Sequence, residues 1–242
     1  MTEAVWHDIE CGSYAADLTL WDELAEPAPR DILDLGCGTG RVSVRLARHG
    51  HRVTGADLEP AFLEEASRRA QAWKVGLDTV TADARSFDLG RRFDLVLAPM
   101  QLVQLFDGSE ERLAMLNAVA AHLRPAGLFA AALMSLEGED LGDEYIPPGP
   151  DMRDLDGWVY SSQPVAVRLL DGDTAISLDR ERTIVAPDGA RTNESSEIRL
   201  ELVSPDKFEE EIAAAGLALA GRRVIPPTED HVGSVVVLAT SP

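Results

Sequence analysis

A glycine-rich turn between an apolar segment and an amphipathic one is the strongest constraint on the fold of this 242-residue chain. Residues 32–35 have the apolar run of a buried strand, and helical periodicity begins at Val42. Between them, Gly36, Gly38 and Gly40 stand at alternate positions, and glycine adopts positive φ at little cost. The sequence therefore predicts a strand, a tight turn and a helix. A ligand can lie directly on the backbone of such a turn, close to the amide groups that begin the helix.

The alternation of strand and helix continues along the chain. Further strands are predicted at residues 52–56, 78–82, 93–98, 128–134, 217–225 and 232–239, and further helices at residues 60–75, 109–123 and 206–215. Strands that alternate with helices form a parallel sheet that is covered on both faces and linked by right-handed crossovers. We therefore expect an α/β fold with a doubly wound, mostly parallel sheet of seven strands.

Two segments lie outside this alternation. Residues 10–26 predict one amphipathic helix with Tyr14 and Trp21 on its apolar side, and we expect residues 1–30 to form a helical lid. Residues 136–204 hold three segments rich in β-branched residues, separated by the hairpin signal Asp-Gly at 171–172 and 188–189. We therefore expect an antiparallel β insert before the last helix. The α/β domain itself would comprise residues 31–135 and 205–242.

The charge balance disfavours several kinds of partner. The chain has 22 Lys and Arg against 42 Asp and Glu, a formal net charge of −20 at pH 7. Residues 137–204, with 16 acidic and 6 basic side chains, carry half of it. Nucleic acids and anionic membranes attract clustered Lys and Arg, so we expect neither as a partner, whereas cationic small molecules would be drawn to this chain.

Other features predict the compartment. The first residues lack the basic and apolar regions of a signal peptide, and no apolar stretch approaches the ~20 residues that span a bilayer. Two cysteines, Cys11 and Cys37, cannot form a disulfide framework. We expect a cytoplasmic protein, a monomer or a homodimer. Without His/Cys ligand clusters or a Ca²⁺ loop, we expect no metal site.

Three aspartates follow or end three successive predicted strands. Asp34 stands two residues before the first glycine of the turn, Asp57 ends the second strand, and Asp83 ends the third. The carboxyl ends of parallel strands meet at one edge of a sheet, so these carboxylates would line one crevice. There they could accept hydrogen bonds from an ammonium group, two ribose hydroxyls and an adenine amino group. Arg41 stands where the dinucleotide pattern has its third glycine, which counts against NAD.

With these residues the chain resembles the class I S-adenosylmethionine-dependent methyltransferases. The resemblance rests on Asp34-x-Gly36-x-Gly38-x-Gly40, on Asp57 and on Asp83 with Ala84, and it covers residues 31–134 closely and 205–240 more loosely. It implies a Rossmann-like methyltransferase fold, the cofactor S-adenosylmethionine and the product S-adenosylhomocysteine. The implied reaction moves a methyl group to an N or O nucleophile of a small molecule by in-line displacement. The lid and the insert look similar to those of small-molecule enzymes, including ones that act on amino-sugar amines.

The resemblance also assigns residues to the cofactor. It implies that Asp34 and the turn, including Cys37, hold the methionine part. Nothing nearby activates the Cys37 thiol, so Cys37 is also interpreted as a small packing residue. It places Asp57 with Leu58 at the ribose, Asp83 with Ala84 at the adenine, and Pro99 with the two residues after it beside the methyl group. Residues 98–101 lack the Asn-Pro-Pro-Tyr signature of enzymes that act on nucleic-acid amines, which again disfavours DNA.

Three residues are candidates for the acceptor side. His231 begins the predicted last strand, whose start lies on the same sheet edge as the crevice, but an exposed hairpin histidine would look the same. Tyr14 could hydrogen-bond the cofactor carboxylate or the substrate, or pack in the core. Gln101 follows the fourth strand, where similar enzymes place groups that face the substrate, or it caps a loop. A neutral amine needs no general base, whereas a hydroxyl usually does.

Two alternatives stay open on the sequence alone. The first is a protein that binds S-adenosylmethionine without methylating anything, as a regulatory or structural subunit. The second is an NAD-linked oxidoreductase, which Arg41 disfavours. Accumulation of S-adenosylhomocysteine distinguishes the first from an enzyme, and a titration with nicotinamide cofactors tests the second.

Overall fold

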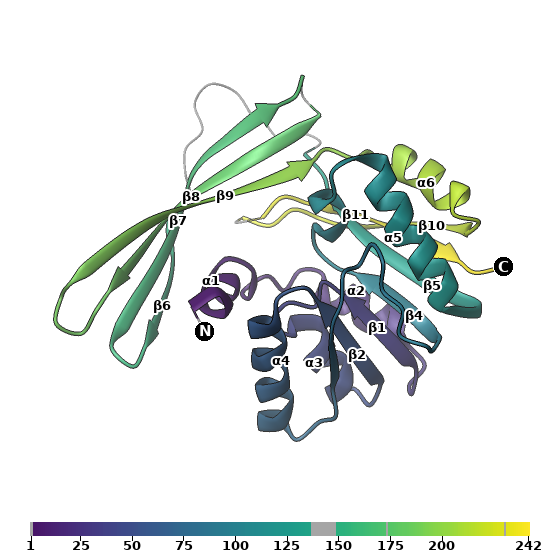
Figure 1. Cartoon of the computed structure of the whole chain (residues 1–242), viewed down its shortest axis with the longest axis horizontal. Helices are drawn as coiled ribbons and strands as arrows, with labels where there is room; N and C mark the ends of the chain where they lie inside the picture. The colour runs from purple at the N-terminus through teal and green to yellow at the C-terminus, as the bar shows by residue number, and fades with distance from the viewer. Residues whose placement is uncertain (1, 137–148, 173, 230) are drawn as a thin grey trace. The chain divides into compact units, whose positions relative to one another are not determined.

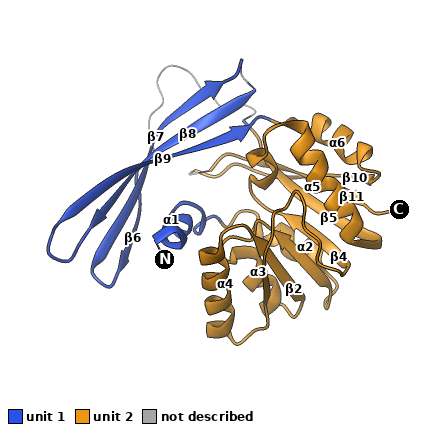
Figure 2. Ribbon diagram, viewed as in Figure 1, with its two compact units in different colours: residues 1–14, 136–202 blue, residues 15–135, 203–242 orange. Residues whose placement is uncertain are grey.

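A computed structural model of the chain describes residues 2–136, 149–172, 174–229 and 231–242. These residues form two compact units (Figure 2). Unit 1 comprises Met1–Tyr14 and Leu136–Leu202, and unit 2 comprises Ala15–Ser135 and Val203–Pro242. None of the helices in the described ranges is long and apolar enough to cross a membrane.

Unit 2 is built on one sheet of seven strands (Figure 1). Its strands are β1 (Asp31–Leu35), β2 (Arg52–Asp57), β3 (Asp78–Thr81), β4 (Phe93–Ala98), β5 (Leu123–Met134), β10 (Ala218–Ile225) and β11 (Ser234–Thr240). Their order in the sheet is β10-β11-β5-β4-β1-β2-β3, and β11 runs antiparallel to both of its neighbours while the pairs from β5 to β3 are parallel. The predicted seven-stranded, mostly parallel sheet is confirmed.

Helices cover both faces of this sheet. The helices of unit 2 are α2 (Leu18–Ala25), α3 (Arg41–Arg48), α4 (Pro60–Trp73), the 3-10 turn η1 (Leu102–Leu105), α5 (Gly108–His122) and α6 (Pro205–Ala214). In β4, Leu95 packs in one apolar cluster with Trp21 of α2, whereas its neighbour Val96 packs in a second cluster with Phe208 of α6. Adjacent strand residues therefore serve opposite cores, which is the arrangement of a doubly wound fold.

The strand order reverses at β1. From β1 the chain adds β2 and β3 on one side, and then crosses to β4 and β5 on the other. Such a switch point leaves a crevice outside the carboxyl ends of the two central strands. The turn after β1 and the segment after β4 border this crevice, so the fold positions residues 36–40 and 99–105 together.

Unit 1 is a four-stranded antiparallel sheet with one helix. Its strands are β6 (Asp151–Leu155), β7 (Trp158–Leu170), β8 (Ala175–Val185) and β9 (Arg191–Glu201), in sheet order β6-β7-β8-β9. The helix α1 (Thr2–Cys11) is tied to the sheet by Glu10, which accepts from Arg182 at 2.7 Å, and by an edge-on contact of Trp6 with Tyr160. The two predicted Asp-Gly connections are confirmed, because they join β7 to β8 and β8 to β9.

Three expectations about local structure differ from the structure. The single helix expected over residues 10–26 is two helices, α1 and α2, because Gly12, a poor helix former, follows Cys11 at the end of α1. The segment 1–30 is therefore shared, with α1 in unit 1 and α2 in unit 2. The insert has four strands and not three, since β6 forms in a polar segment where no strand was expected. The expected strand at 232–239 begins at Ser234.

Candidate functional site

The turn between β1 and α3 has the backbone that its glycines predict. Gly36, Gly38 and Gly40 have φ of 62°, 54° and 85°. A Cβ on Gly36 would lie 2.9 Å from Cδ1 of Leu102, and one on Gly40 would lie 2.9 Å from Cβ of Ala66. Glycine is therefore required at these two positions both for the dihedral angle and for the close packing of η1 and α4 against the turn.

Asp57 holds the turn onto the end of β2. The backbone N–H of Gly38 donates to its Oδ2 at 2.8 Å, and the N–H of Glu59 donates to its Oδ1 at 3.0 Å. The N–H of Cys37 donates to the carbonyl of Ala56 at 3.0 Å, which continues the pairing of β1 with β2 into the turn. Each carboxylate oxygen has a second lone pair, so Asp57 retains acceptor capacity for a ligand.

Asp34 is a buried acid at the end of β1. Its side chain is 1% exposed, and the hydroxyl of Ser43 in α3 donates to its Oδ2 at 2.5 Å. No described residue donates to its Oδ1, although that atom is buried as well. Burial raises the pKa of Asp34 to about 7, while Ser43 and Arg41 oppose the rise and Asp57 adds to it. A buried acceptor without a donor is costly, and a ligand cation would satisfy it.

Arg41 has a structural partner that explains why position 41 is not glycine. Its guanidinium makes two hydrogen bonds to Asp17, at 2.6 and 2.7 Å, and Trp21 Nε1 donates to the same carboxylate at 2.7 Å. Asp17 and Trp21 are both buried. This clamp ties the start of α3 to α2, and it keeps the positive charge of Arg41 near the turn.

Cys37 is a packing residue. Its thiol is buried, and a Cβ on Gly55 of β2 would lie 2.8 Å from its sulfur. Burial and the charges of Asp34 and Asp57 raise the pKa of the Cys37 thiol, so the thiol stays neutral and unreactive. Cys37 therefore packs as a small residue beneath the turn, and its part in holding the methionine part stays a prediction.

The segment that follows β3 lies beside Asp57. The N–H of Ala82 donates to the carbonyl of Asp57 at 3.0 Å, and Asp83 follows directly. The guanidinium of Arg85 binds both oxygens of Asp83, lowers its pKa, and reaches Glu111 of α5 at 2.6 Å. An adenine amino group would therefore share the Asp83 carboxylate with Arg85. On the β2 side, Leu58 leaves 60% of its surface exposed and offers an apolar face to a ring.

The segment after β4 is held rigidly. Met100 has a positive φ of 56°, which is unusual for a residue with a side chain and typical of functional loops. Gln101 precedes η1, and its carbonyl accepts from the N–H of Gln104 at 2.9 Å. The buried carboxamide of Gln104 accepts from the N–H of Met134 at 2.6 Å, so this residue anchors the segment to β5.

The remaining predicted residues lie at two different places. His231 lies just before β11, and its N–H donates to Thr228 Oγ1 at 3.1 Å. Ser234 of β11 is paired with Met134 at the carboxyl end of β5, so the chain enters β11 at that edge of the sheet, and the role of His231 stays a prediction. Tyr14 is buried and belongs to unit 1, so its role at the cofactor stays a prediction.

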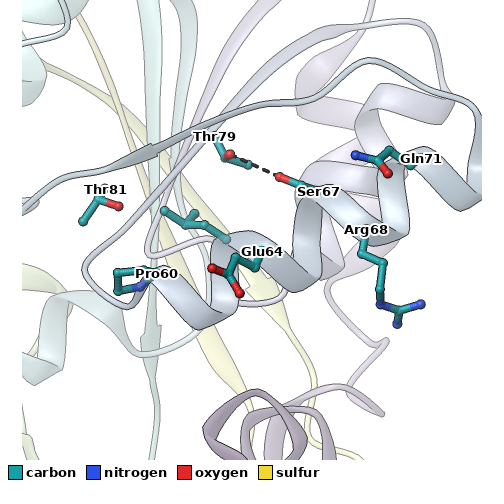
Figure 3. A pocket seen from close by; sticks show the side chains of 8 residues that line it. Pro60, Glu64, Ser67, Arg68, Gln71, Thr79 and Thr81 are labelled. Atoms are coloured by element: carbon teal, nitrogen blue, oxygen red, sulfur yellow. Dashed lines mark hydrogen bonds between the residues drawn. The ribbon is translucent and has the colours of Figure 1, made fainter. Parts of the chain in front are cut away.

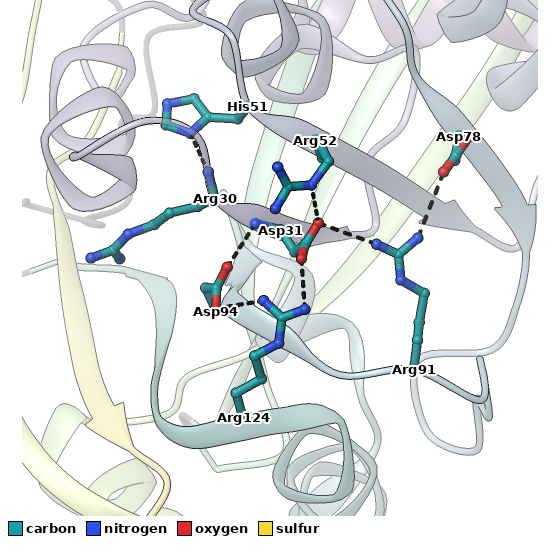
Figure 4. A network of polar contacts seen from close by, with 8 residues as sticks. All are labelled: Arg30, Asp31, His51, Arg52, Asp78, Arg91, Asp94 and Arg124. Carbon is teal, nitrogen blue, oxygen red and sulfur yellow. Dashed lines mark hydrogen bonds and ion pairs between the residues drawn. The ribbon is translucent and has the colours of Figure 1, made fainter.

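Two further features of unit 2 do not include the predicted site residues. A groove of about 510 Å³ runs between α4 and the edge strand β3, lined by Ser67, Thr79 and six others, none of them predicted for the site (Figure 3). At the amino end of β1, Asp31 accepts from Arg52 and Arg124, each at 2.6 Å, which lowers its pKa to about 2 (Figure 4). The acids at that edge are already paired, in contrast to Asp34.

Comparisons with known proteins agree with this geometry. The sequence profile of a family described as "Methyltransferase domain" matches residues 32–127. The cypemycin N-terminal methyltransferase of Streptomyces sp is 34% identical over 116 residues, so the chain spans 46% of that relative and the match covers 48% of this chain. The dTDP-3-amino-3,6-dideoxy-alpha-D-glucopyranose N,N-dimethyltransferase of Streptomyces fradiae is 27% identical over 207 residues, 85% of this chain and 76% of that protein.

A solved structure shares the fold. The sugar N-methyltransferase KedS8 from Streptoalloteichus sp ATCC 53650 superimposes with a TM-score of 0.80 at 19% identity, and the match covers 100% of this chain and 92% of that one. The fold and the glycine turn define a Rossmann-like α/β protein. The matched profile covers residues 32–127 and the relatives named above are methyltransferases, which agrees with the resemblance to class I S-adenosylmethionine-dependent methyltransferases that the residues of the turn predicted.

The residues of the site fit S-adenosylmethionine, the cofactor that the resemblance implies. S-adenosylmethionine carries an ammonium group, and Asp34 Oδ1 is a buried acceptor to which no described residue donates. The helix α3 has Gly40 at its N-cap, and glycine offers no capping side chain. A helix N-terminus favours negative charge, so this one suits the carboxylate next to the ammonium group.

Proposed function

We propose that this protein transfers the methyl group of S-adenosylmethionine to a nitrogen or oxygen of a small molecule, and that an amine such as that of an amino sugar is the preferred acceptor. The orphaned Oδ1 of buried Asp34 carries the cofactor part of the proposal. Two observations favour an amine: the relatives named above are N-methyltransferases, and the net charge of −20 attracts cations.

In this proposal the cofactor part of the site is divided among three strand ends. Asp34 and the backbone of Gly36, Gly38 and Gly40 hold the methionine part. Asp57 accepts from the ribose hydroxyls beside Leu58, and Asp83 with Ala84 binds the adenine. S-adenosylmethionine supplies an electrophilic methyl group on a sulfonium, so no residue has to activate the methyl donor.

On the acceptor side, the main contribution of the protein is to orient the nucleophile relative to the methyl group. Holding a nucleophile in line with a methyl group can lower the barrier by up to ~7–11 kcal/mol. Pro99 and the strained Met100 fix the backbone at this place, and Gln101 offers a carboxamide to the acceptor. A neutral amine needs no base. His231 is the imidazole of this edge that would take the proton from a hydroxyl, and Tyr14 is proposed to contact the cofactor or the acceptor.

Calorimetric titration tests the cofactor, and turnover tests the activity. We expect binding of S-adenosylmethionine and S-adenosylhomocysteine in the micromolar range, about −8 kcal/mol, and none of NAD. With panels of amino sugars and of matched hydroxyl sugars, S-adenosylhomocysteine should accumulate with the amines, and the product mass should increase by one or two methyl groups. Binding without turnover on any acceptor would favour the non-catalytic alternative, and binding of NAD alone would overturn the proposal.

A further inference from the structure

Ser43 determines which oxygen of Asp34 is available. Ser43 is the third residue of α3 and is fully buried. Its hydroxyl has one proton, which it donates to Asp34 Oδ2 at 2.5 Å. The carboxylate is thereby fixed in rotation, and Oδ1 is left as the acceptor without a donor among the described residues.

The surroundings of Ser43 leave no room for another arrangement. Gly55 of β2 is paired with Asp34 across the sheet. A Cβ on Gly55 would lie 2.8 Å from the sulfur of Cys37 and 3.2 Å from the hydroxyl oxygen of Ser43. Cys37 and Ser43 therefore pack closely against the backbone of Gly55, in the space that a side chain at position 55 would need.

The charges that face Asp34 favour a cationic ligand. The hydroxyl and the backbone of Ser43, with the charge of Arg41, lower the pKa of Asp34, whereas burial and Asp57 raise it. The thiol of Cys37 is neutral. Arg41 is itself paired with Asp17. The carboxylate is thus kept close to ionisation in a buried place, where the attraction of an ammonium group is strong.

We propose that Ser43 is a positioning residue that presents Asp34 Oδ1 to the ammonium group of S-adenosylmethionine. Ser43 does not touch the ligand in this arrangement, because its hydroxyl and its side-chain volume are used by Asp34 and by the packing against β2. The inference rests on the proposed assignment of Asp34 to the ammonium group.

A pair of ligands separates this role from a general structural one. S-adenosylhomocysteine carries the ammonium group, whereas 5′-methylthioadenosine keeps the adenosine and the sulfur but lacks the amino-acid part. In calorimetric titrations of the full chain, Ser43→Ala should weaken S-adenosylhomocysteine binding about 10- to 100-fold, the effect of a lost hydrogen bond to a charged group, and should change 5′-methylthioadenosine binding less than about twofold.

A control removes a buried hydroxyl that does not meet Asp34. Thr54 lies in β2 next to Gly55, and its buried Oγ1 has no partner among the described residues. Thr54→Val should leave both affinities unchanged. If Ser43→Ala weakened both ligands equally, or neither, the positioning role would be overturned.

A second variant separates this inference from the proposed function. Asp34→Asn should weaken S-adenosylhomocysteine far more than 5′-methylthioadenosine, because an amide replaces the anion that meets the ammonium. Selective loss with Asp34→Asn but not with Ser43→Ala would overturn the inference about Ser43 alone. Absence of selective loss with Asp34→Asn would overturn the assignment of Asp34 itself, and the role of Ser43 with it.

Discussion

At the scale of single residues, the raised pKa of Asp34 makes cofactor binding depend on pH. Burial holds this pKa at about 7, so the ligand-free protein keeps a proton there at pH 6. An ammonium ligand needs the carboxylate, and binding must release that proton. The affinity for S-adenosylhomocysteine should therefore rise by about tenfold per pH unit below pH 7 and level off above it.

The sign of this linkage can be checked in two ways. Titrations in buffers of different ionisation enthalpy at pH 6 should show about one proton released, and Asp34→Asn should show none. The pKa of Asp34 in the folded protein is above the ordinary aspartate value of 3.8, so the contribution of Asp34 to the free energy of unfolding should decrease as the pH rises from about 3.8 to about 7. A cofactor affinity that is constant from pH 5.5 to 8 would contradict the assignment.

Asp57 serves the turn and the ligand together. It accepts from Gly38 and Glu59, so its loss frees two backbone N–H groups as well as any ribose contact. Asp57→Ala should weaken S-adenosylhomocysteine binding by about 1.5–3 kcal/mol, measured by calorimetry on protein whose circular dichroism is unchanged. Glu64→Ala, an exposed carboxylate of α4, is the matched control and should have no effect. Unchanged affinity of a folded Asp57→Ala protein would refute the ribose assignment.

Features of this site that depend on local pattern could be predicted from the sequence, whereas contacts between residues far apart in the chain could not. The positive φ of the three glycines and the placement of Asp34 and Asp57 at strand ends could be predicted, because local pattern and strand topology determine them. The clamp of Arg41 on Asp17, 24 positions earlier, could not, since no local pattern relates the two residues. The sequence did not indicate the role of Ser43 either, because its contact with Asp34 depends on the angle at which α3 leaves the turn.

At the scale of elements, a buried ion pair joins α5 to α6. Arg112 donates to Glu211 through two nitrogens, at 2.8 and 2.9 Å, and both side chains are buried. Glu211→Ala leaves the guanidinium without this partner, so we expect a loss of about 3–5 kcal/mol in the free energy of unfolding, measured with urea. The double variant Arg112→Met with Glu211→Leu removes both charges and should recover most of that loss. A double variant as unstable as Glu211→Ala would show that the loss comes from packing.

Other elements show where periodicity misleads. The apolar positions Tyr14, Leu18 and Trp21 keep a helical spacing through the non-helical residues 12–17 into α2, so the pattern alone predicts one helix. The helix α1 ends before them because Gly12, a poor helix former, follows Cys11. Strand β6 was not predicted because its sequence has no apolar pattern. Its residues are polar, and it is held by backbone pairing with β7 and by ion pairs such as Asp151 with Arg180.

At the scale of the whole molecule, the net charge of −20 distinguishes an amine acceptor from a hydroxyl one. The ammonium form of the acceptor is attracted by the field of the protein, and it must release a proton to solvent before its neutral nitrogen attacks the methyl group. The range of the field shrinks from about 30 Å at 0.01 M salt to about 10 Å at 0.1 M. A neutral hydroxyl acceptor has no such attraction, although both acceptors must meet the same methyl group.

Salt should therefore affect the two acceptor classes differently. Raising the ionic strength from 0.01 to 0.5 M should increase KM for an amino sugar by roughly 3- to 10-fold and leave kcat nearly unchanged, because steering acts on association and is screened. With the matched hydroxyl sugar, KM should stay within about twofold across the same series. Steady-state assays that follow S-adenosylhomocysteine measure both. Equal salt dependence for the two sugars would locate the effect in cofactor binding, and a KM for the amine that falls with salt would contradict electrostatic attraction of the acceptor.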